Sequence, residues 1–76
     1  MSKYRIAINT DVAARLKALR RLRGITQEQL AEQTGLCEQT IRLYENAHLG
    51  ISPARLEDLA AALHTTPDHL ASGGPR

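Results

Sequence analysis

A short stretch near the middle of the chain carries side chains that together can read the edges of DNA bases. On a helical wheel, residues 37–46 place an amide, a guanidinium and a leucine opposite Ile41, with a carboxylate in the exposed first turn. Glutamine pairs with adenine, arginine with guanine or phosphate, glutamate with the amino group of cytosine, and leucine with the thymine methyl. A merely solvated helix face is the alternative. The candidate base-reading residues are Glu38, Gln39, Arg42 and Leu43.

A face of this kind needs a helix that other helices hold in place, and the hydrophobic periodicity predicts only helices over most of the chain. Thr26 and Gln29 have the spacing of a capping box, and Ser52 and Thr66 each precede a proline suited to the first helical position. Gly24 and Gly35 each follow an expected helix and suit the left-handed conformation that ends one. The expected helices run from Asn9 or Thr10 to about Gly24, from Thr26 to Gly35, over about 37–46, from Ser52 through Leu63, and as a last turn from Thr66 past Leu70.

The composition limits the fold and the class of function. The chain has 76 residues, 42% of them hydrophobic, with two Tyr and no Trp or Phe, which favours one small all-α domain. A single cysteine excludes an internal disulfide framework and fits the cytoplasm. No apolar run is long enough to span a membrane and no signal-peptide core is present, so we expect no membrane association. The expected organisation is an arm over 1–9, a domain over 10–71 and a flexible tail over 72–76.

The positive charge is concentrated at the start of the chain. Residues 1–23 hold seven Lys or Arg against one Asp, a balance of +6, whereas residues 24–76 hold three Arg against seven carboxylates, a balance of −4. This distribution predicts one surface that faces a polyanion, although a solvated basic helix would give the same count. Lys3 and Arg5 of the arm could reach a minor groove, or the arm could pair as a strand.

The motifs occur in an order that resembles the phage-repressor (Xre/Cro-type) helix-turn-helix family. The resemblance covers about residues 10–70. It rests on four runs at matching spacing: Thr26-Gln27-Glu28-Gln29-Leu30-Ala31, Thr34-Gly35-Leu36, Gln39-Thr40-Ile41 and Tyr44-Glu45-Asn46. It implies a compact five-helix lambda-repressor-like fold, with the helix-turn-helix at the second and third helices and the third helix in the major groove.

The resemblance also implies roles for individual residues. Base reading falls to the start of the third helix, hence Glu38 and Gln39, and to Leu43, while the position of Arg42 often points toward the DNA backbone. Arg20 and Glu45 both flank core stripes, and the family pattern implies that they form a partly buried, structural ion pair between the first and third helices. The candidate phosphate contacts are Thr26, Gln27, Thr40, Asn46 and Arg23, with Arg21 beside the last.

Three positions depart from the family pattern. Cys37 stands where Ser or Thr is usual, which weakens the helix cap; we expect a small buried core residue beside Ile41 rather than a redox-sensing thiol. Ala47 replaces a common glycine, so the exit from the third helix can differ. Residues 48–51 are apolar with few basic groups, which leaves Leu49 and Ile51, with the segment around Leu70, as candidates for a dimer contact.

The functional prediction is a sequence-specific, repressor-type regulator that binds double-stranded DNA as a homodimer. Two recognition helices would lie about 34 Å apart on a near-palindromic operator. We expect no enzyme, no cofactor and no metal, since His48, His64 and His69 lack ligand spacing and no nucleophile–base set is present. An antitoxin with a toxin partner, or a protein-interaction module that does not bind DNA, are the alternatives.

Overall fold

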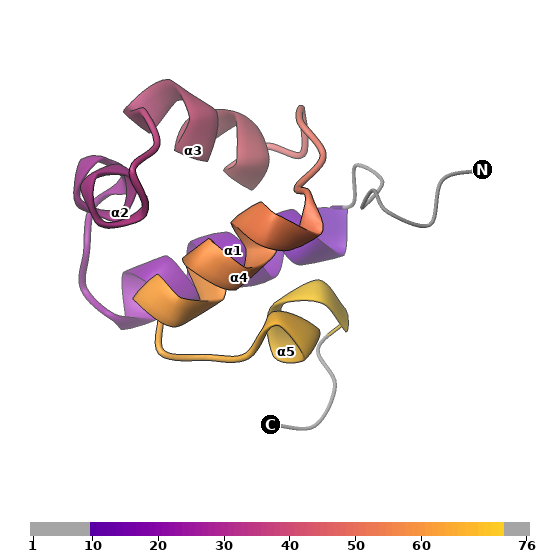
Figure 1. Cartoon of the computed structure of the whole chain (residues 1–76). Helices are drawn as coiled ribbons and strands as arrows, with labels where there is room; N and C mark the ends of the chain where they lie inside the picture. Colours follow the sequence, from indigo (N-terminus) through magenta and orange to yellow (C-terminus); the bar gives the residue numbers. More distant parts are fainter. Residues whose placement is uncertain (1–9, 73–76) are drawn as a thin grey trace.

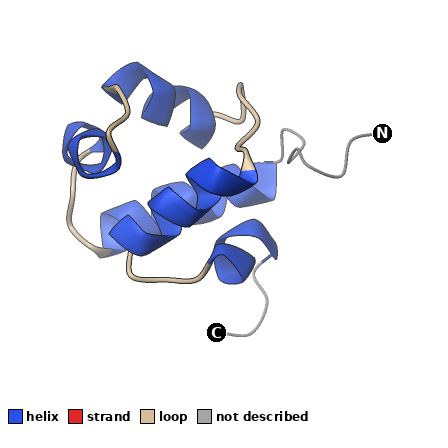
Figure 2. Cartoon of the chain, viewed as in Figure 1, coloured by secondary structure: helices blue, strands red, loops and turns tan. Residues whose placement is uncertain are grey.

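The structure is a computed structural model that describes residues 10–72, and these residues form helices joined by short loops, without a strand (Figures 1 and 2). The expected arm over 1–9 and residues 73–76 of the expected tail lie outside this range. Ser72, expected in the tail, is the last residue of the final helix. The elements are α1 (Thr10–Leu22), α2 (Gln27–Thr34), α3 (Glu38–Glu45), α4 (Pro53–Ala62) and α5 (Pro67–Ser72).

The predicted all-α, five-helix class is confirmed, and the caps explain where the helices begin. The Thr26 hydroxyl accepts a hydrogen bond from the Gln29 amide at 3.0 Å, and the Gln29 side chain accepts one from the Thr26 amide at 2.8 Å. This is the expected capping box of α2. Ser52 and Thr66 accept from the amides three residues later at 3.3 and 3.1 Å, which caps α4 and α5.

One hydrophobic core joins the helices. Helix α3 packs on α1 and α2, α4 packs on α2 and α5, and α5 packs on α1 (Figure 1). Each fully buried leucine or isoleucine stabilises the fold by about 1.5–3 kcal/mol relative to an exposed one. No helix within residues 10–72 has the length and apolar character to cross a membrane. The fully buried large side chains are Leu16, Leu30, Ile41, Leu59, Leu63 and Leu70.

Two arginines, one in α1 and one directly after it, fasten the ends of other helices. Arg15 donates to the carbonyls of Leu70 and Ala71 at 2.9 and 2.7 Å, and Arg23 donates to those of Leu63 and His64 at 2.9 and 3.3 Å. The last carbonyls of a helix have no partner within it and carry the negative end of its dipole. The two guanidinium groups therefore act as caps for α5 and α4.

Two residues do not lie where the sequence predicted them. Cys37 was expected on the core stripe, but it is exposed, because α3 begins one residue later and Cys37 has extended backbone with φ −94° and ψ 158°. A wheel of 100° per residue does not apply to a cap residue. Ile51 was expected as a dimer contact, but it is 3% exposed and belongs to the core, because the segment before α4 folds inward.

The chain leaves α3 through a strained residue. Ala47 has a φ of 58°, in the left-handed region that glycine adopts without cost. The amides of Ala47 and His48 donate to the carbonyls of Tyr44 and Leu43 at 3.1 and 2.9 Å. These bonds satisfy the end of α3 only if residue 47 keeps that conformation, so alanine stands where the backbone favours glycine.

We predict that Ala47→Gly increases the free energy of unfolding by about 0.5–1 kcal/mol, because relief of the left-handed alanine exceeds the added freedom of glycine in the unfolded chain. Ala18→Gly, in the exposed middle of α1, is the control and should lower it by about 1 kcal/mol. Urea unfolding followed by circular dichroism measures both. If Ala47→Gly destabilised the chain as Ala18→Gly does, the strain at residue 47 would be disproved.

Candidate nucleic-acid interface

The turn between α2 and α3 consists of three residues and sets the two helices across each other. Gly35 has a φ of 73°, which the reversal of the chain requires and which favours glycine. The next amide, that of Leu36, donates to the Ala31 carbonyl at 2.9 Å, and the Leu36 side chain packs against the core. Figure 1 views α2 along its axis while α3 runs across the picture, so α3 is presented at the edge of the molecule.

The outer face of α3 carries the four predicted base-reading side chains. Glu38, Gln39 and Arg42 are exposed and Leu43 is half-buried, whereas the opposite face is buried in the core through Ile41. Leu43 is outside the core cluster, so its side chain remains at the edge of the exposed face. The structure therefore gathers an amide, a guanidinium, a carboxylate and an apolar side chain on one helix face.

Two of these side chains form an ion pair along the helix. Nη2 of Arg42 lies 3.3 Å from Oε2 of Glu38, four residues earlier, and about half of each side chain is exposed. An exposed pair of this kind stabilises a helix by only about 0.3–0.5 kcal/mol. The pair therefore contributes little to the stability of the fold.

A shallow open hollow adjoins the start of α3. The hollow lies where the first turn of α2 begins, and the free backbone amides of such a turn favour an anion. Thr26 and Gln27, two predicted phosphate contacts, line it together with two basic side chains of α1. The lining residues are Arg20, Arg21, Gly24, Ile25, Thr26, Gln27, Glu28 and Glu38.

The remaining predicted phosphate contacts are spread over the molecule. Asn46 is exposed at the end of α3, and Thr40 is half-buried beside Cys37. Arg23 is set apart from this group, because its guanidinium caps α4. The structure thus brings Thr26 and Gln27 to the start of α3, Asn46 to its end, and Arg23 to neither.

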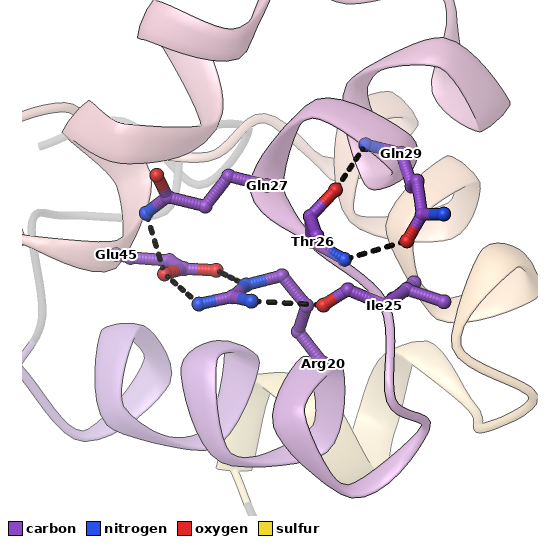
Figure 3. A network of polar contacts seen from close by, with 6 residues as sticks. All are labelled: Arg20, Ile25, Thr26, Gln27, Gln29 and Glu45. Carbon is purple, nitrogen blue, oxygen red and sulfur yellow. Dashed lines mark hydrogen bonds and ion pairs between the residues drawn. The ribbon is translucent and has the colours of Figure 1, made fainter.

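Below the outer face, a buried network holds α3 to the rest of the chain (Figure 3). Arg20 donates to both carboxylate oxygens of Glu45, from Nε at 2.6 Å and from Nη2 at 3.1 Å, and from Nη1 to the Ile25 carbonyl at 2.9 Å. Gln27 donates to the same carboxylate at 3.0 Å. The Glu45 and Arg20 side chains are 1% and 10% exposed. One carboxylate therefore joins α1, the start of α2 and the end of α3.

Two basic side chains of α1 are left for contacts outside the chain. The ion pairs within residues 10–72 use neither Lys17 nor Arg21. Arg21 lines the hollow at the start of α3, and Lys17 lines a second hollow at its end, beside Asn46 and Ala47. Sequence reasoning missed Lys17, although its position four residues before Arg21 places both on one side of the helix.

Cys37 has an unusual environment for a thiol. Its Sγ lies 3.1 Å from the Thr40 hydroxyl, and this hydrogen bond, with backbone amides of the first turn, lowers the pKa of Cys37 below its ordinary value. Within residues 10–72, no three His, Cys, Asp or Glu side chains lie close enough together to hold a metal ion. The hydrogen bond to the Thr40 hydroxyl is therefore the feature that sets the environment of this thiol.

Comparison with known proteins gives matches that cover most of the chain. A family model described as a helix-turn-helix domain matches residues 11–72. The restriction-modification controller protein C.AhdI from Aeromonas hydrophila is 31% identical over 80% of this chain and 92% of its own, with a TM-score of 0.78. No curated protein matches the sequence.

The P22 c2 repressor gives two further matches. Its DNA-binding domain in solution is 29% identical over 86% of this chain and 87% of its own, with a TM-score of 0.80. The same repressor in complex with a synthetic operator is 26% identical over 87% of this chain and 100% of its own, also with a TM-score of 0.80. These matches confirm the resemblance to phage repressors, and the fold is that of helix-turn-helix DNA-binding regulators.

We predict that Glu45→Ala lowers the free energy of unfolding by about 3–5 kcal/mol, because it leaves a buried guanidinium without its carboxylate. The double change Arg20→Met with Glu45→Leu should recover most of that loss, since neither charge is then buried alone. Asp58→Ala, which breaks the exposed pair with Arg55, is the control and should cost less than about 1 kcal/mol. Chemical denaturation measures all three. Additive losses in the double variant would contradict the assignment.

The thiol environment predicts the pH dependence of alkylation. Because the pKa of Cys37 is lowered, the reactive thiolate forms at a lower pH than in an ordinary cysteine, and the rate of reaction with iodoacetamide should rise at correspondingly lower pH. Thr40→Val removes the hydroxyl that is the main cause and should move the midpoint of the rate profile to higher pH. An unchanged midpoint would show that the hydroxyl does not act on the thiol.

Proposed function

Since this chain belongs to the helix-turn-helix domain family, we propose that it is a repressor-type transcription regulator that recognises a near-palindromic operator. In this proposal α3 enters the major groove as part of a domain of residues 10–71. The observation that carries the proposal is the division of α3 into a buried face and an exposed face of base-reading groups.

The base contacts are assigned to the outer face of α3. Gln39 is exposed in the first turn, where its amide can donate to and accept from adenine at once. Glu38 and Arg42 flank it with opposite charge, and Leu43 offers an apolar surface for a thymine methyl. Each good bidentate contact discriminates against the wrong base by about 1–3 kcal/mol.

The phosphate contacts are assigned to the two ends of the same surface. Thr26 and Gln27 lie at the start of α2, where backbone amides and the helix dipole favour an anion. Thr40 and Asn46 are the further candidates on α3. Lys17 and Arg21 supply the free positive charge beside the two hollows. Arg23 is not included, because its guanidinium is engaged at the end of α4.

The short recognition helix supports the proposal of a dimer. The eight residues of α3 extend about 12 Å, which corresponds to three or four base pairs at about 3.4 Å each. Two copies on half-sites about 34 Å apart would double the sequence that is read. Ile51 and Leu70 are used inside the chain, whereas Leu49 is 40% exposed in the loop after α3. We assign Leu49 to the contact between copies.

The proposal predicts the outcome of selection from a random duplex library near physiological salt. The chain should enrich an inverted repeat, and Gln39→Ala should weaken binding to that repeat about 10-fold or more while leaving binding to unrelated DNA unchanged. Gln33→Ala is the matched control, because Gln33 is exposed near the end of α2 beside α4 and away from the outer face of α3. Both affinities are measured by fluorescence anisotropy.

The same experiment defines the results that would refute the proposal. Binding without any enriched sequence, lost near about 200 mM salt, would indicate general attraction to a polyanion. No binding to DNA would indicate a protein-interaction module. Enrichment of a single half-site by a chain that stays monomeric in analytical ultracentrifugation would refute the dimer and retain base reading.

A further inference from the structure

We infer that Glu38 and Arg42 act together as one reading unit for a G·C base pair, in which Glu38 sets specificity at the expense of general affinity for DNA. The inference rests on the proposed function and deepens it. Its geometric basis is the ion pair of 3.3 Å between the two side chains on the outer face of α3, with about half of each side chain exposed.

The position of Glu38 has an electrostatic consequence. It lies in the exposed first turn of α3 and also lines the hollow that adjoins the start of α2. A carboxylate there faces the phosphates of any bound duplex, so it lowers affinity for DNA of every sequence. The second carboxylate of α3, that of Glu45, is buried in its own ion pair and has no such effect. Glu38 therefore increases the affinity only for DNA that offers its carboxylate a hydrogen-bond donor.

The ion pair places the Arg42 guanidinium beside the Glu38 carboxylate. Nη2 of Arg42 lies 3.3 Å from Oε2 of Glu38, and about half of the Arg42 side chain is exposed, so an edge of the guanidinium with two donors stays available to DNA. Guanine alone presents two adjacent acceptors, O6 and N7, to donors of this kind in the major groove. The neighbouring carboxylate repels a phosphate, which bears a negative charge, more strongly than the neutral edge of a base. The pairing thus favours guanine over the backbone.

The two ends of the unit match the two bases of one pair. In the major groove, cytosine offers an amino donor next to the acceptors of guanine, and the Glu38 carboxylate can accept from that amino group. Four residues of helix rise about 6 Å, less than two base-pair steps of about 3.4 Å each, so both side chains reach the same or adjacent pairs. Thymine would instead place its methyl against the carboxylate or the guanidinium. The ligand is therefore an operator with a G·C pair under the first turns of α3.

The competing explanation is an ordinary surface pair that only supports the helix. Such a pair contributes about 0.3–0.5 kcal/mol to stability, and its loss would leave base preference unchanged. The two explanations differ in the base preference of one variant. If Glu38 is a specificity residue, Glu38→Gln weakens discrimination at one base pair and also strengthens binding to unrelated DNA. If the pair is only structural, the loss of a negative charge can still strengthen binding to unrelated DNA, but discrimination at every base pair is retained.

The test compares Glu38→Gln, Arg42→Ala and the double variant with the unaltered chain. Each is put through selection from a random duplex library, and its affinity for an unrelated duplex is measured at 50 and 150 mM salt. Asp58→Asn is the matched control, because it removes one negative charge from another exposed ion pair, on α4. Because Asp58 lies away from the outer face of α3, this control gives the effect of losing one negative charge outside the proposed interface.

We expect the unaltered chain to enrich a G·C pair at one position of each half-site. Glu38→Gln should reduce that preference about 10-fold or more, keep the other positions, and bind the unrelated duplex about threefold more tightly at 50 mM salt, beyond any gain in Asp58→Asn. Arg42→Ala should lose the preference at the same or the adjacent pair, and the double variant should lose no more than the single variants, as expected for one unit.

Each of the other outcomes refutes either the reading unit or the proposed function. If the unaltered chain enriches a sequence and Glu38→Gln retains the full preference, the reading unit is refuted while the proposed function stands. The same conclusion follows if Glu38→Gln and Arg42→Ala act at unrelated positions with additive losses. If the unaltered chain enriches no sequence, the proposed function fails and the inference fails with it.

Discussion

The buried ion pair between Arg20 and Glu45 is the interaction on which the arrangement of the interface depends. It would be costly if it stood alone, because removing two charges from water costs several kcal/mol for each ion. Here the guanidinium makes two bonds to the carboxylate and one to the Ile25 carbonyl, and Gln27 makes a further bond to the same carboxylate. The donors and acceptors are thus matched across three elements. The pair fixes the direction in which α3 faces more than it increases the stability of the chain.

The first helix has a structural role that its charge alone does not reveal. Two of its arginines, and a third directly after its end, are directed inward or along the molecule: Arg15 caps α5, Arg20 joins α3, and Arg23 caps α4. The charge balance of +6 over residues 1–23 therefore overstates what a polyanion would meet. Within α1, Lys17 and Arg21 remain for such a contact. Charged side chains can be counted from the sequence, but the direction in which each one points depends on which backbone carbonyl the fold brings within its reach.

Local signals predicted much of the fold, and positions decided by tertiary packing escaped prediction. The capping box at Thr26 and the left-handed Gly35 are determined within a few residues, so the starts and ends of the helices follow from the sequence. Cys37 was misplaced because a cap residue does not follow helical periodicity. Ile51 was misplaced because an apolar residue in a loop gives no sign of whether the loop folds inward. The outer face of α3 was predictable for the same reason as the core, since one periodicity defines both faces.

The proposed binding surface for operator DNA is the outer face of α3 together with the start of α2. This surface can be mapped by titrating the isotope-labelled chain with its selected operator duplex and following the backbone amide chemical shifts in NMR spectra. We expect the largest changes in chemical shift at residues 26–28 and 37–43, with small changes across α4 and α5. Changes centred on the exposed side of α4, or spread evenly over the chain, would contradict it.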